Sequence, residues 1–122
     1  MRLLAIFVAF IIASPLAALQ VETKTGTAAV LRALDTLTGK VTDLTIKPGQ
    51  TEKYKRLIIS IKECRYPKDN PSSDAFAYVT IRDVREDNDR FDAWMIASSP
   101  ALSALDHPRY DVWLLRCKIS NG

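Results

Sequence analysis

The chain has 122 residues, a formal net charge of +3 at pH 7, and charged side chains at 25% of its positions. This length predicts a single domain. Because basic and acidic residues are interspersed, no concentrated basic face is expected, which argues against a nucleic-acid partner and limits membrane contact to a peripheral one. One histidine and two cysteines are too few for the usual zinc sites.

The N-terminus has the composition of a secretory signal peptide. Arg2 supplies a positive charge, residues 3–13 are apolar, and Ser14-Pro15 is followed by small residues. The apolar run is shorter than the ~20 residues that a spanning helix needs. We expect residues 1–18 to direct export to the periplasm, with an uncleaved anchor as the alternative. Residues 19–26 should then be a flexible leader before a β domain at 27–120.

Export changes the interpretation of Cys64 and Cys117. In an oxidising compartment a lone pair of cysteines most simply forms one disulfide, and closing this loop would stabilise the fold by roughly 4 kcal/mol. Cys64 is out of phase with the apolar face of its segment. Pairing therefore requires either a bulge or a position for Cys64 beyond the end of its strand, and we expect the second.

Alternating apolar residues predict strands along most of the domain. Residues 27–37 fit a helix or a strand, and Gly39 ahead of the alternating residues 41–46 favours a hairpin. Further strands are predicted over residues 54–63, 76–84, 91–96 and 110–119, with a long loop at 66–74. The strand at 110–119 is apolar on both faces, which predicts a central position. We expect an all-β fold: a small antiparallel sandwich or partly open barrel of six or seven strands with one short helical turn and one disulfide.

The helical turn is predicted just before the last strand. Ser99 should cap its first amides and Pro100 fits its first position, while Pro108 disfavours helical angles at the residue before it. Leu102 and Leu105 should point into the core. Trp94 and Trp113, which flank the turn, are also expected in the core because of their size.

Catalysis is not expected at this corner. Ser98, Ser99 or Ser103 together with His107 and an aspartate would be the residue types of a serine triad, but no glycine provides a nucleophile elbow or oxyanion hole. The acidic residues between positions 83 and 92 lack the glycine of a calcium loop. We therefore expect no catalytic residue, no metal and no cofactor.

The residues left without a structural explanation form a candidate contact surface. They are Ser98, Asp106 and His107 at the corner, and Phe76 and Tyr78 on the outer face of a strand.

The tract from Trp94-Met95 through Ser98-Ser99-Pro100-Ala101-Leu102 to Tyr110-Asp111-Val112-Trp113 resembles a family of short exported bacterial proteins. That family is catalogued as a domain of unknown function and occurs mainly in alphaproteobacteria. The chain departs from it mildly, with Asp106 in place of glutamate and Ala93 in place of glycine. The resemblance implies export and supports pairing of Cys64 with Cys117, but it implies no activity or cofactor.

The expected function is a periplasmic, non-catalytic interaction module. It would bind another envelope or inner-membrane protein through a strand edge or the 66–74 loop. The alternative is a small periplasmic enzyme or glycan-binding domain that uses the corner between Ser98 and Tyr110.

Overall fold

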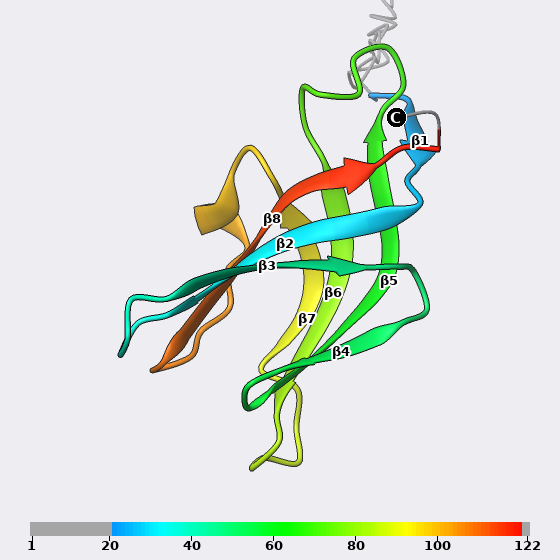
Figure 1. Ribbon diagram of the computed structural model, residues 1–122. Coiled ribbons are helices and arrows are strands. Elements are labelled where there is room, and N and C mark those ends of the chain that lie inside the picture. The colour runs from blue at the N-terminus through cyan, green and yellow to red at the C-terminus, as the bar shows by residue number, and fades with distance from the viewer. Residues whose placement is uncertain (1–20, 121–122) are drawn as a thin grey trace, which may run out of the picture.

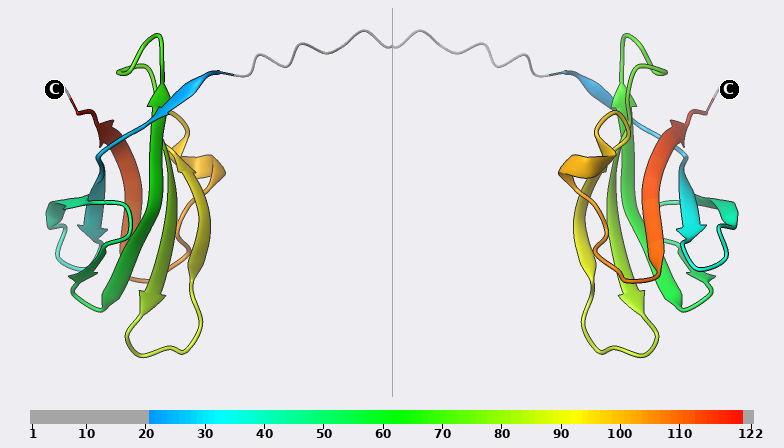
Figure 2. Two further views of the ribbon diagram at one scale, coloured as in Figure 1. Left: turned by 90° about the vertical axis from the view of Figure 1, so that its right-hand side faces the viewer. Right: turned by 90° about the vertical axis from the view of Figure 1, so that its left-hand side faces the viewer.

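A computed structural model describes residues 21–120, so the predicted signal peptide at 1–18 lies outside the described residues. Two antiparallel sheets face each other across a shared core (Figures 1 and 2). The strands are β1 (Thr23–Thr25), β2 (Ala28–Asp35), β3 (Val41–Ile46), β4 (Thr51–Tyr54), β5 (Leu57–Pro67), β6 (Phe76–Asp83), β7 (Phe91–Ile96) and β8 (Tyr110–Lys118), with one 3-10 turn, η1 (Pro100–Leu102).

The larger sheet has the order β1-β5-β6-β7, with β4 also paired to β5, and the smaller sheet has the order β3-β2-β8. Neither sheet closes on itself. The structure thus confirms the all-β antiparallel fold, and the short strands β1 and β4 bring the total to eight described strands rather than six or seven. The core lies between the sheets and is formed mainly by alternate residues of β2, β5, β6 and β8.

Residues 27–37 belong to a hairpin, as favoured from the sequence. β2 pairs with β3, and Gly39 in the connection has a φ of 74°, the left-handed region that glycine adopts without strain. The leader was predicted to be flexible as far as residue 26, which is wrong for Thr23–Thr25, because this segment pairs with the end of β5.

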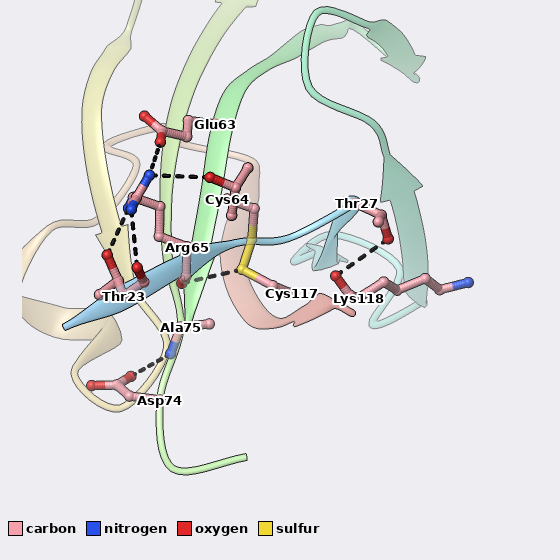
Figure 3. Close-up of a disulfide and its surroundings, with 10 residues drawn as sticks. Thr23, Thr27, Glu63, Cys64, Arg65, Asp74, Ala75, Cys117 and Lys118 are labelled. Atoms are coloured by element: carbon pink, nitrogen blue, oxygen red, sulfur yellow. Dashed lines mark hydrogen bonds and ion pairs between the residues drawn. A yellow bond between two sulfur atoms is a disulfide. The ribbon is translucent and has the colours of Figure 1, made fainter. Parts of the chain in front are cut away.

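Two bulges turn both cysteines into the core. The pairing of β5 with β6 skips Lys62, and the pairing of β8 with β2 skips Leu115. An extra residue shifts the inward–outward alternation by one position. Cys64 and Cys117 therefore both face inward and form a disulfide between the two sheets (Figure 3). The prediction that Cys64 lies beyond the end of its strand is wrong, since β5 continues to Pro67.

Gly26 crosses between the sheets directly beside this disulfide. Its N–H donates to the carbonyl of Cys64 at 2.6 Å. A β-carbon added to Gly26 would lie 2.7 Å from the Cβ of Cys117 and 2.9 Å from the carbonyl oxygen of Lys118. Only a residue without a side chain fits here, so the leader changes sheets at the one point where glycine allows it.

The helical turn before β8 is shorter than predicted. It ends at Leu102, whose side chain is exposed rather than in the core, whereas Leu105 is buried as expected. Ser99 occupies the cap position, but its side chain makes no capping hydrogen bond. Pro100 stands in the first turn as predicted.

Candidate functional site

Asp35, at the end of β2, is a fully buried carboxylate. It accepts hydrogen bonds from the Arg109 guanidinium at 3.1 and 3.3 Å, from Lys55 Nζ at 2.6 Å, and from the N–H of Leu37 at 3.0 Å. Arg109, and then Lys55, hold the pKa of Asp35 far below its usual range despite burial. This aspartate is therefore ionised throughout the physiological range.

Asp83, at the end of β6, is the second buried carboxylate. His107 Nε2 lies 2.9 Å from its Oδ2, and the N–H of Arg85 donates to its Oδ1 at 2.9 Å. The hydrogen bond from His107, followed by that from Arg85, lowers the pKa of Asp83 to about 2. The Arg56 guanidinium, 3.7 Å away, adds a weaker attraction.

The hydrogen bonds of His107 define its tautomer. Its Nδ1 accepts from the N–H groups of Arg109 at 3.0 Å and Tyr110 at 3.3 Å, so the ring proton resides on Nε2 and is donated to Asp83. The side chain is only 1% exposed. Both nitrogens are engaged, which leaves neither for a serine nucleophile or a metal.

Tyr110 lies between the two carboxylates. Its ring stacks on His107 at 5.0 Å and meets the edge of Tyr54 at 5.7 Å, and the guanidinium groups of Arg56 and Arg109 lie 5.5 and 5.4 Å from its centre. We call Asp35, Asp83 and the side chains bound to them the aspartate corner. It joins β2, the β4–β5 turn, the end of β6 and the start of β8. These interactions hold the two sheets together, which is a structural role.

The three contact residues predicted at the corner, Ser98, Asp106 and His107, lie in separate surroundings. His107 belongs to the aspartate corner, and its side chain is buried, so the imidazole ring is not available at the surface. Ser98 is exposed and binds Asp74, its N–H and hydroxyl donating to that carboxylate at 2.9 and 2.7 Å. Asp106 is exposed, and its backbone carbonyl accepts from Arg90. The corner between Ser98 and Tyr110 is therefore not assembled around one centre.

Phe76 and Tyr78 are half-buried on the outer face of β6. Tyr78 meets Trp94 of β7 edge-on at 5.5 Å, and its hydroxyl donates to Asp92 at 2.8 Å. Trp94 is 40% exposed, so the expectation that it lies in the core is wrong. These aromatic residues stay candidates for contacts.

β8 is an edge strand, contrary to the central position predicted from its two apolar faces. Among the described strands it pairs with β2 alone. The sheets are open between β8 and β7, and the chain between these strands runs along the opening (Figure 1). We call this opening the β8 seam.

Two hollows lie along the β8 seam. The larger, of about 660 Å³, is lined on one side by the five consecutive residues Leu115–Ile119 and on the other by Pro71–Asp74, Ala97 and Ser98. The smaller, of about 340 Å³, is lined by Asp111–Trp113 and by Pro100, Ala101, Ala104 and Leu105. Side chains of a strand alternate between its two faces, so a hollow on one face would be lined by every second residue. Five consecutive residues line the larger hollow, which therefore lies beside the backbone edge of β8.

This seam was not identified from the sequence. The apolar character of Trp113 and Leu115 suggested a buried outer face, whereas both residues are half-buried and line the hollows. The described residues contain no cluster of three or more potential metal ligands. No helix among them is long and apolar enough to span a membrane.

Comparison with known proteins places residues 29–117 in a bacterial sequence family described as "Uncharacterized protein conserved in bacteria (DUF2155)". The uncharacterized protein RP359 of Rickettsia prowazekii (strain Madrid E) is 27% identical over 99 residues, which cover 79% of this chain and 64% of the relative. The chain thus matches less than two thirds of that relative's length. No solved structure matches it.

Proposed function

The chain belongs to the DUF2155 family of bacterial proteins, and we propose that it is an exported, non-catalytic interaction module that binds an extended segment of another envelope protein along β8. The family confirms the resemblance drawn from the tract between Trp94 and Trp113. Export is supported by the composition of residues 1–18 and by the disulfide, which persists in oxidising compartments.

The observation that carries this proposal is that the backbone edge of β8 facing away from β2 has no paired strand among the described residues and lies beside two hollows. An unpaired strand offers a row of N–H and C=O groups that an extended peptide satisfies by adding one more strand. A hollow beside such an edge gives room for one strand and its side chains. The aspartate corner offers no competing centre, because its two carboxylates are already bound by Arg109, Lys55 and His107.

Photocrosslinking from defined strand positions tests the proposal. A photoreactive amino acid replaces Trp113, Leu115 or Ile119 in the exported protein in its native envelope, and the crosslinked residues of the partner are mapped. We expect the three positions to reach neighbouring residues of one short segment, in sequence order.

The matched control is Val41, an exposed residue of β3 at the other edge of the same sheet. It should give no crosslink to that segment. Crosslinks scattered over unrelated surfaces of the partner, or equal crosslinking from β3 and β8, would contradict capture along β8.

A further inference from the structure

The outward side chains of β8 carry an ordered set of charges. Because of the bulge at Leu115, the residues that face away from the core are Asp111 and Trp113 before it, and Arg116 and Lys118 after it. Asp111, Arg116 and Lys118 are exposed, and none forms a salt bridge with another described residue of the chain. The strand therefore presents one negative charge at its start and two positive charges at its end.

An added strand places its own outward side chains next to these. Residues on the same face of adjacent strands interact across the pair, and opposite charges are favoured over like charges. The inward side chains of the added strand would meet the apolar lining of the hollows, which includes Ala97, Leu105 and Leu115. The partner segment should thus alternate apolar and polar residues.

The direction of the added strand follows from the stability of antiparallel pairing. β8 pairs with β2 in the antiparallel sense, and antiparallel pairs are slightly more stable per residue than parallel ones. A segment antiparallel to β8 begins beside Lys118 and ends beside Asp111. Its first half then lies against the two basic residues.

From these observations we propose that the partner segment runs antiparallel to β8, with acidic residues in its N-terminal half, a basic residue at its C-terminal end and apolar residues at the alternate, inward positions. This inference rests on the proposed function, since it specifies the segment that the β8 seam captures.

Three synthetic peptides as long as β8, nine residues, test it by titration against the protein. The acidic-first peptide is Glu-Val-Glu-Val-Thr-Val-Lys-Val-Thr, whose first, third and seventh residues lie opposite Lys118, Arg116 and Asp111 when the bulged Leu115 is skipped. The second peptide has the reverse sequence, and the third has threonine at every charged position. We expect the acidic-first peptide to bind about fivefold more tightly than the reverse peptide, because three exposed ion pairs are exchanged for like-charge contacts. In about 1 M salt this ratio should approach one.

The double variant Arg116→Glu, Lys118→Glu should invert the preference in favour of the reverse peptide. The control Lys47→Glu, Lys53→Glu makes the same change of net charge at two exposed residues outside the seam, one directly after β3 and one within β4. It should keep the original preference. A cooperative thermal melt of each variant is required as the control for folding.

The outcomes separate this inference from the proposed function. Equal binding of all three peptides would overturn the charge order while leaving strand capture in place, and tighter binding of the reverse peptide would overturn the antiparallel order. Absence of binding by the threonine peptide and both charged peptides, together with absence of the β8 crosslinks, would overturn both proposals.

Discussion

Opposite ends of the sandwich are joined by different chemistry. At one end the Cys64–Cys117 disulfide and the crossing at Gly26 tie β5, β8 and β2 together. At the other end the aspartate corner does so with buried ion pairs and hydrogen bonds. The first depends on the redox state and not on pH, whereas the second depends on the ionisation of two carboxylates.

β8 takes part in both ends. Its first residue, Tyr110, is packed in the aspartate corner, and Cys117 near its end is covalently bound to β5. A strand fixed at both ends needs no second neighbour to hold it in place. This explains how β8 keeps its extended form between Tyr110 and Cys117 with β2 as its one paired neighbour among the described strands.

The largest expected effect is the loss of the disulfide. Replacing Cys64 and Cys117 by alanine together should lower the free energy of unfolding by about 4 kcal/mol, because the closed loop of 53 residues no longer restricts the unfolded chain. Urea unfolding of the variant at pH 7 measures this. An unchanged midpoint would show that the aspartate corner alone holds the sheets.

Gly26→Ala should weaken the same end without breaking the covalent bond. The new β-carbon would overlap the Cβ of Cys117 and the carbonyl of Lys118, and relieving such overpacking costs up to about 3 kcal/mol. Gly39→Ala is the control, since the surroundings of Gly39 are open and only its positive φ is unfavourable for alanine. This substitution should lower the free energy of unfolding by about 1 kcal/mol. Equal losses in chemical denaturation would argue against tight packing at Gly26.

Asp83→Asn tests the opposite end. The amide keeps the size of the side chain but loses the charge that attracts His107 and Arg56. We therefore expect the free energy of unfolding to fall by about 2 kcal/mol. His107→Asn in the Asp83→Asn background should add little if the two residues act as one pair. Fully additive losses in a double-mutant cycle would contradict that coupling.

The smallest effect is the pH dependence that separates the two ends. The folded pKa of Asp83, about 2, lies below the unfolded value of about 3.9. Its contribution to stability is thus present above pH 4 and is lost as the pH falls towards 2. The difference in melting temperature between the wild type and Asp83→Asn should shrink over this interval, whereas the difference between the wild type and the double alanine variant of the cysteines should not follow it.

Candidate contact residues were harder to predict than strands. Ser98, Asp106 and His107 are close in sequence and rich in polar groups, which made them a plausible common surface. In the folded chain His107 turns inward to Asp83, which is 24 residues away, and Ser98 turns to Asp74. These two partners lie at the end of β6 and in the loop before it, and a single sequence carries no direct record of such pairs.

The sequence by itself indicated every described strand except β1 and β4, and it favoured the hairpin at Gly39, the all-β class and the partnership of the two cysteines. These follow from local rules: side chains of a strand alternate, glycine permits a positive φ, and two cysteines have one way to pair. Tertiary structure alone decided the bulges at Lys62 and Leu115, the edge position of β8 and the burial of Asp35 and Asp83. Register and neighbours depend on which strands meet across the whole fold, and an apolar outer face looks the same in sequence whether another strand or a hollow lies beside it.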